Sequence, residues 1–448
     1  MVKYRFPAFR TAIPLVSAGL ALAACRPAPT SALGPVAGNS FVVRDVRVFD
    51  GAKVIERTSV AVRNGRIISV GRDIPRDLPS IDGRGRTLIP GLIDAHAHIQ
   101  NENQLRDGLR FGVTTMLDMF TRPEFVAAQR PRRDSIVRTD LADMYSSGVP
   151  VTSPGGMGTQ FGIPLTTISG PGEAEANVGE RLAQGADYVK IMYEPNAKLF
   201  ATISEQTLGA VIAAVHARGK LAVVHVSSMS GGRDVARARA DGLAHLFSDS
   251  IIDASVVEEI SRSAMFVIPT LSIHHAFEGG DFRRSLAEDP RLAPFLTTRQ
   301  RSAQTGPSPS KDGPMAPYLS RFKADRAMEN ARRLHKAGVK LFAGDDAASD
   351  LAAIGVSLHG ELELLTMAGL SPLEALHAAT GGPAVAFGLS DRGRIAQGAR
   401  ADLLLIDGNP LEDIRITRAI ARVFKNGFEI SRTPPAPAPA AATKANSK

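Results

Sequence analysis

The stretch GLIDAHAHI, residues 91–99, is a short apolar run that carries two histidines two positions apart. A run of this length predicts a buried strand, and side chains at positions i and i+2 of a strand project from the same face. We therefore expect His96 and His98 to point the same way, as a pair that suits one divalent metal ion. A His-x-His pair is only weakly diagnostic by itself, so its meaning depends on the rest of the chain.

Seven further apolar runs follow this stretch, and helical patterns separate most of them. The runs cover residues 114–119, 142–147, 188–192, 221–226, 242–247, 266–271 and 339–346, with helical patterns such as 204–218, 232–240, 254–263 and 321–337. Eight strands with helical crossovers over residues 87–390 predict an α/β fold, a (β/α)8 TIM barrel. A doubly wound sheet is the alternative, but it predicts one ligand crevice at a reversal of strand order instead of polar residues at many strand ends.

Both ends of the chain carry a different pattern, in which short alternating strands surround hairpin signals. Residues 40–86 contain such runs on both sides of Asn64-Gly65, and residues 391–432 repeat the arrangement around Asn426-Gly427. An Asn-Gly pair between alternating runs is a strong signal for a two-residue hairpin. Two β segments that flank the barrel region predict a small composite β-sandwich domain formed from both chain ends.

Residues 1–24 have the features of a secretory signal peptide, with a basic start, a short apolar run and small residues before Cys25. The sequence LAAC at residues 22–25 also resembles the bacterial lipobox, in which the cysteine is lipidated and becomes the mature N-terminus. Residues 25–39 are then a tether, and residues 433–448 a disordered Pro/Ala tail. We therefore expect an exported protein that is lipid-anchored in the bacterial cell envelope, at the periplasmic face of the outer membrane in a Gram-negative host.

The composition excludes several classes of protein. A single cysteine rules out an internal disulfide framework and a Cys-rich zinc site. The 448-residue chain has 53 basic and 45 acidic residues, a net charge of +8 that falls to +5 without the first 24 residues. Basic residues are scattered among acidic ones without a row of aromatic residues, so nucleic acid is not an expected partner. We expect a small-molecule substrate, and the sequence leaves the oligomeric state open.

Polar side chains stand at the ends of several further predicted strands. Lys190 lies within an apolar strand, where an unpaired cation is costly. His225 ends the next strand, His245 lies in the one after it, and Asp346 ends the last. Each alone has an ordinary structural explanation, such as a satisfied core histidine or a helix-capping aspartate. In a barrel, however, these positions and the histidine pair converge on the catalytic face at the carboxyl ends of the strands.

On these residues the chain resembles the amidohydrolase superfamily of metal-dependent hydrolases. The resemblance rests on IPGLIDAHAH at residues 89–98, on DYVKI at 187–191, and on His225, His245 and Asp346. It extends over about residues 40–430 and points to the branch that contains Xaa-Pro dipeptidases and imidazolonepropionases. It implies the same barrel and composite β domain that the strand patterns predict.

The resemblance also implies two divalent metal ions, with zinc as the first choice and manganese, cobalt or iron as alternatives. The implied ligands are His96, His98 and Asp346 for one ion, and His225 and His245 for the other. Lys190, carboxylated by CO2, would bridge both ions, which accounts for a lysine inside an apolar strand. A metal-bridged hydroxide would then attack the substrate carbonyl, with Asp346 as general base and later as general acid.

Some positions depart from the family or concern the substrate. Asp345 stands where relatives often have threonine, and since adjacent strand residues face opposite ways, the motif favours Asp346 as the ligand. Tyr193 is a candidate catalytic and substrate-binding residue through a hydrogen bond to the substrate carbonyl. His274 and His275 are candidates for binding an anionic group. Ordinary loop positions are the alternative explanation for all three.

The sequence therefore predicts an amidohydrolase that cleaves the C–N bond of a small substrate such as a dipeptide or an N-acyl amino acid. Two alternatives stay open: a lactonase or esterase with the same binuclear site, and a lipoprotein that binds a ligand without catalysis. The complete set of six polar residues argues against the second alternative. The exact substrate and the identity of the metal are not decided by the sequence.

Overall fold

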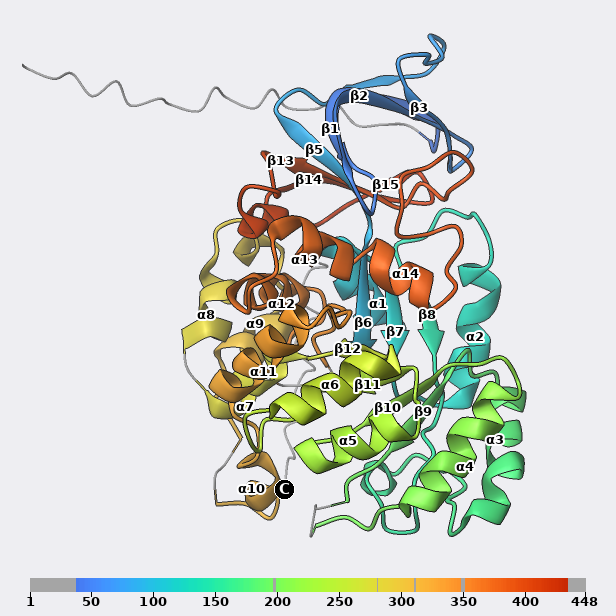
Figure 1. Ribbon diagram of the computed structural model, residues 1–448. Coiled ribbons are helices and arrows are strands. Elements are labelled where there is room, and N and C mark those ends of the chain that lie inside the picture. The colour runs from blue at the N-terminus through green and yellow to red at the C-terminus, as the bar shows by residue number, and fades with distance from the viewer. Residues whose placement is uncertain (1–37, 196–198, 280, 310–311, 348–350, 434–448) are drawn as a thin grey trace, which may run out of the picture. The chain divides into compact units, whose positions relative to one another are not determined.

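The computed structural model describes residues 38–195, 199–279, 281–309, 312–347 and 351–433 (Figure 1). The predicted signal peptide, the lipidation site Cys25, and all but the ends of the predicted tether and tail lie outside the described residues. Within the described ranges, no helix is both long and apolar enough to cross a membrane.

Strands from both ends of the chain form one mixed sheet, in which the blue and red strands of Figure 1 lie side by side. The strands are β1 (Phe41–Phe49), β2 (Val54–Arg63), β3 (Arg66–Gly71), β4 (Ser80–Asp82), β5 (Arg86–Pro90), β13 (Leu403–Asp407), β14 (Ile420–Lys425) and β15 (Phe428–Ile430). Their order is β15-β14-β13-β5-β1-β2-β3, with β4 beside β1. The composite β domain predicted from the two ends is confirmed.

The two Asn-Gly hairpins close this sheet as predicted. Asn64 and Gly65 have φ of 52° and 74°, and Asn426 and Gly427 have φ of 53° and 77°, the left-handed values that a two-residue turn needs. Two parts of the sheet face each other, and the rings of Phe41 on β1 and Phe424 on β14 stack with their centroids 4.5 Å apart. Facing side chains of this kind are the core of a β-sandwich.

Parallel strands form the barrel in the middle of the chain. They are β6 (Leu92–Ala97), β7 (Val113–Asp118), β8 (Asp143–Ser146), β9 (Val189–Met192), β10 (Ala222–His225), β11 (Gly242–Ala244) and β12 (Phe266–Ile268). Ladders join β6-β7-β8 and β9-β10-β11-β12, and isolated parallel bridges complete the circle. One bridge pairs Val151 with Ile191, and two others attach residues 341 and 347 to β12 and β6. The (β/α)8 barrel is confirmed, with residues 341–347 in the eighth position.

The predicted strand at 339–346 is less regular than the other seven. It bonds its neighbours through single contacts, such as Ala95 N to the carbonyl of Ala343 at 2.9 Å and Asp346 N to the carbonyl of His96 at 2.8 Å. Asp346 has a φ of 52°, outside the strand region of backbone conformation. The backbone therefore turns at the position where its aspartate reaches the site.

Helices surround the strands and cover the barrel (Figure 1). They are α1 (Glu102–Arg110), α2 (Pro123–Arg133), α3 (Ala174–Ala183), α4 (Glu205–His216), α5 (Met229–Arg237), α6 (Ala254–Ser263), α7 (Leu271–Glu278), α8 (Asp281–Glu288), α9 (Thr298–Thr305), α10 (Ala316–Leu319), α11 (Ala324–Lys336), α12 (Val356–Met367), α13 (Pro372–Ala378) and α14 (Gly381–Ala386). Side-chain caps fix several starts: Ser204 accepts from the backbone N–H of Thr207, and Asp253 from that of Val256. These capped helices follow β9 and β11 after intervening loops, since β9 ends at Met192 and α4 begins at Glu205.

Candidate active site

A cavity of about 730 Å³ opens at the carboxyl ends of the barrel strands. Five of the predicted site residues line it: His98, Lys190, His225, His245 and Asp346. The sixth, the fully buried His96, lies directly behind His98 and Asp346. The structure therefore brings together all six residues that the sequence selected from separate strands.

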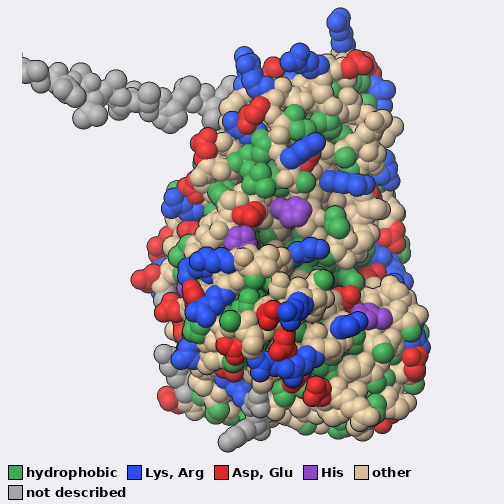
Figure 2. Space-filling model, in the orientation of Figure 1, with side chains coloured by type: hydrophobic (Ala, Val, Ile, Leu, Met, Phe, Trp, Pro, Cys, Tyr) green, Lys and Arg blue, Asp and Glu red, His purple; other side chains and the backbone are tan. Residues whose placement is uncertain are grey.

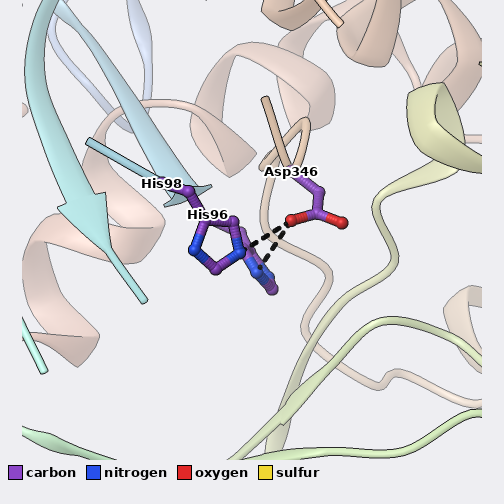
Figure 3. A group of neighbouring side chains, drawn as sticks. All are labelled: His96, His98 and Asp346. Carbon is purple, nitrogen blue, oxygen red and sulfur yellow. Dashed lines mark ion pairs between the residues drawn. The ribbon is translucent and has the colours of Figure 1, made fainter. Parts of the chain in front are cut away.

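His96, His98 and Asp346 form the tightest group (Figure 3). The Oδ1 atom of Asp346 lies 3.0 Å from Nε2 of His98 and 3.3 Å from Nε2 of His96. The three donor atoms lie within 4.8 Å of one another, which is compact enough to hold one ion. His96 lies on β6 and His98 directly follows it, and both converge on a carboxylate from the opposite end of the barrel sequence, as Figure 3 shows.

Asp345 takes a different place from Asp346. Its side chain is fully buried and accepts the backbone N–H of Ala347 at 2.9 Å, and its own N–H points to Asp94. Burial beside the carboxyl of Asp94 raises the pKa of Asp345 well above its ordinary value. Asp346 thus lines the cavity and Asp345 is buried in the protein, as the sequence predicted, although Asp346 has a left-handed φ and so strand alternation is not the cause.

Lys190 is 1% exposed, and its ammonium nitrogen has no hydrogen-bonding partner among the described residues. Burial lowers the pKa of this lysine to about 7, despite the opposing charges of Asp346 and Asp118. A lysine that is readily neutral is a nucleophilic amine, and carboxylation by CO2 requires that form. The environment therefore fits a lysine that carries a modification.

His225 at the end of β10 and His245 directly after β11 also line the cavity. The rings of His225 and His245 have centroids 4.6 Å apart, and His245 is 4.5 Å from His96. Nδ1 of His245 contacts Oγ1 of Thr270 at 2.9 Å, while Nε2 of His225 lies 2.9 Å from Oε1 of Glu194. One ring nitrogen of each histidine is thereby held by the protein, and the other is left for a ligand.

The donor set suits divalent metal ions. Burial lowers the pKa of His96 to about 3 and that of His245 well below its ordinary value, so both imidazoles are neutral, as metal ligands must be. Neither ring nitrogen of His96 makes a hydrogen bond of good geometry within the described structure. Buried polar atoms without partners are rare in proteins unless an ion or a ligand satisfies them.

The backbone around these residues is strained. His245, Thr270 and Asp346 all have left-handed φ, at 67°, 50° and 52°. This conformation is unfavourable for a β-branched residue such as threonine, and it persists where the surroundings impose it. Its concentration at three contacting residues is typical of a functional site.

Comparisons with known proteins agree with this geometry. The sequence profile of the Amidohydrolase family matches residues 87–430. The chain belongs to the amidohydrolase family. It is 25% identical over 406 residues to a dihydroorotase of Anaeromyxobacter sp. (strain K), with 81% of this chain and 88% of the relative covered. It is 22% identical over 435 residues to the ochratoxinase of Aspergillus niger, with 83% and 82% covered.

A solved Xaa-Pro dipeptidase with methionine bound in its active site has a similar fold. The superposition has a TM-score of 0.69 at 20% identity and covers 87% of this chain and 99% of the dipeptidase. The family match and the hydrolases among the relatives show that this amidohydrolase is an enzyme that hydrolyses carbon–nitrogen bonds of small amides. Its family generally uses divalent metal ions for this chemistry.

Three predicted substrate residues of this amidohydrolase lie outside the cavity lining. The hydroxyl of Tyr193 donates to Oδ2 of Asp234 at 2.9 Å, whereas its neighbours face the site: Met192 lines the cavity and Glu194 contacts His225. His274 is buried against Ser248, and His275 packs against the ring of Phe282. The structure therefore does not bring Tyr193, His274 or His275 together with the six residues.

Two other residues of the amidohydrolase stand at the site, and sequence reasoning missed both. Glu194 is 2% exposed and contacts His225, and Tyr318, 7% exposed, lines the cavity. Burial and the carboxylate of Glu194 raise the pKa of Tyr318 well above its ordinary value. Glu194 had a usable signal, an acidic residue four positions after Lys190, whereas Tyr318 lies in a long connection without a recognisable pattern.

Proposed function

We propose that this amidohydrolase cleaves the amide bond of an N-acyl amino acid or a dipeptide with two bound divalent metal ions, zinc being the first choice. The observation that carries the proposal is Lys190, which lines the cavity with the histidines and is buried without a hydrogen-bonding partner among the described residues. A carboxylated Lys190 would supply an anionic oxygen ligand for bound divalent ions. His96, His98 and Asp346 would hold one ion, and His225 and His245 the other.

The residues of the chain divide the reaction between them. Bound divalent ions would polarise the scissile carbonyl and lower the pKa of the nucleophilic water. Asp346 accepts a proton from that water as its oxygen bonds to the carbonyl carbon, and returns the proton to the amine nitrogen as the C–N bond breaks. The products are a carboxylic acid and an amine, which balances the addition of one water.

The cavity supports a substrate with an apolar acyl group and a carboxylate. Its walls are largely aromatic and aliphatic, and Phe161 lies at its edge although 61% exposed. Arg122 also lines the cavity, and its guanidinium has no hydrogen-bonding or ion-pair partner among the described residues. An unpaired cation beside an apolar cavity suits a substrate that is apolar at one end and anionic at the other.

The experiment is metal analysis combined with a substrate screen, on soluble protein that lacks residues 1–25 and is supplied with bicarbonate. We expect two divalent ions per chain and turnover of N-acyl amino acids or Xaa-Pro dipeptides. Matched amide and ester substrates are compared, since preference for the ester would favour the lactonase or esterase alternative.

K190A should lower the metal content and the activity together, because a carboxylated Lys190 would be one of the metal ligands. The exposed K220A is the matched control and should retain both. Full metal content in K190A would contradict the binuclear site, and a lack of turnover by metal-loaded wild type would contradict hydrolysis of this substrate class.

We also propose that the protein is exported and anchored to the cell envelope through a lipid on Cys25. The support is the LAAC sequence after an apolar run, with the only cysteine of the chain in the required position. In a Gram-negative host, the full chain should incorporate a labelled fatty acid and sediment with outer membranes, whereas C25S should not be labelled. Equal labelling of both proteins would exclude Cys25 as the anchor.

A further inference from the structure

The side chain of Tyr318 is fixed at the wall of the cavity. It comes from α10, and its hydroxyl lies 3.2 Å from Nε2 of His225. Edge-to-face contacts hold the ring, with Phe322 at 5.3 Å and Phe200 at 5.7 Å between centroids. Because these rings leave the tyrosine little rotational freedom, the hydroxyl has a defined position beside the proposed metal ligands.

A buried carboxylate lies beside this hydroxyl but binds it only weakly. Oε1 of Glu194 lies 3.4 Å from the hydroxyl of Tyr318 and only 2.9 Å from Nε2 of His225. Oε2 accepts a short hydrogen bond from Ser227 at 2.5 Å. The carboxylate is thus already satisfied by the histidine and the serine, and its bond to the tyrosine is long and weak.

The proton of Tyr318 is therefore available to another acceptor in the cavity. A hydroxyl hydrogen rotates about its C–O bond toward the best acceptor within reach. The cavity wall beside it consists of Met157, Met192 and Phe322, none of which accepts a strong hydrogen bond. A carbonyl oxygen of a bound substrate would be the strongest acceptor that enters this space.

We propose that Tyr318 is a catalytic residue that donates a hydrogen bond to the carbonyl oxygen of the scissile amide. The inference rests on the hydrolysis proposed above and gives Tyr318 the role that the sequence suggested for Tyr193. As water adds to the carbonyl carbon, negative charge develops on this oxygen, and the fixed hydroxyl stabilises it more strongly than in the bound substrate. The tyrosine keeps its proton throughout, since Asp346 carries out the proton transfer.

The test compares wild type, Y318F and Y193F as metal-loaded proteins on a substrate that wild type hydrolyses. We expect Y318F to lose about 100-fold in kcat with little change in KM, as for removal of one oxyanion donor. The affinity for a tetrahedral phosphonate analogue, measured by calorimetry, should fall by a similar factor. Metal content and thermal midpoint should match wild type, which a merely structural role of the hydroxyl would not give.

The outcomes separate the two proposals. Retention of kcat and of analogue affinity in Y318F would overturn the role of Tyr318 while leaving the hydrolysis intact. A loss of kcat in Y193F instead of Y318F would return the role to the residue that the sequence suggested. If the wild type hydrolyses no amide, the proposed function is wrong. The affinities of wild type and Y318F for the phosphonate would then still show whether the hydroxyl of Tyr318 contacts a bound oxyanion.

Discussion

At the scale of single residues, Arg122 gives the most direct test of substrate recognition. It is exposed, lines the cavity and directly precedes α2, so its replacement leaves the core intact. For an N-acyl amino acid, R122Q should lower kcat/KM about tenfold, the equivalent of about 1.4 kcal/mol for one charge-assisted contact. For the same substrate as its neutral carboxamide, the change should be about twofold or less.

The carboxamide serves as the internal control, since it keeps the shape of the substrate and lacks only its charge. An equal loss on both substrates would mean that Arg122 acts on the protein and not on the carboxylate. A loss on neither would remove Arg122 from substrate binding and direct attention to other polar groups of the cavity.

Single residues also mark the limit of prediction from the sequence. The six polar residues at strand ends were predictable, because a barrel directs every such position to one face. Tyr193 was misassigned, because the alternation that turns Lys190, Met192 and Glu194 toward the site turns Tyr193 away from it. Tyr318 was not predictable, because its place depends on a loop whose path no periodic pattern encodes. Tyr193 follows Lys190 by three residues, yet it turns to Asp234, while Tyr318 reaches the cavity from more than a hundred residues away.

At the scale of elements, regular strands and helices were predictable to within a few residues. The strand predicted at 188–192 is β9, which begins one residue later. The helix predicted at 254–263 is α6, which has the same bounds. The eighth strand was predicted as regular, but single bridges and a left-handed Asp346 interrupt it. A local hydrophobic pattern predicts which residues are buried. It does not predict an irregular backbone conformation at a functional residue such as Asp346.

One element supports the site from outside the barrel. Glu361 on α12 is fully buried and accepts the backbone N–H groups of Leu271 and Ser272, at 2.9 and 2.7 Å. These two N–H groups begin α7, directly after the strained Thr270 that contacts His245. The sequence gives no sign of this link, because it joins elements 90 positions apart through a buried carboxyl group that accepts the first N–H groups of a helix.

At the scale of the whole molecule, charged side chains spread over the surface while a buried cluster joins barrel and composite sheet. Figure 2 shows basic and acidic side chains interspersed over the face in view, which agrees with the scattered charges of the sequence. In the interior, Oδ2 of Asp143 on β8 forms ion pairs with Nζ of Lys425 on β14 at 2.7 Å and with Nη2 of Arg392 at 2.8 Å. Lys425 also contacts Asp402 at 2.6 Å.

This cluster makes the barrel depend on the chain ends for its stability. Burial alone would raise the pKa of Asp143, but the charges of Lys425 and Arg392 outweigh it and hold the pKa below its ordinary value. K425M leaves Asp143 and Asp402 buried with fewer partners, which should cost about 3 kcal/mol. For a chain of this length, this corresponds to a fall of about 3 °C in the thermal midpoint.

The exposed pair of Arg63 on β2 and Asp77 in the connection between β3 and β4 provides the matched control. R63M should change the midpoint by less than about 1 °C, because exposed ion pairs contribute little.

The stabilisation by Asp143 should also depend on pH. A carboxyl whose pKa is lowered by folding stabilises the folded protein at pH values above its pKa in the unfolded chain, near 3.9, and this contribution is lost as the pH falls further. The difference between wild type and K425M should therefore be complete at pH 7 and diminish below about pH 4. Equal midpoints of K425M and wild type at pH 7 would show that the cluster does not hold the two parts together, since the buried carboxylates would then have found other partners.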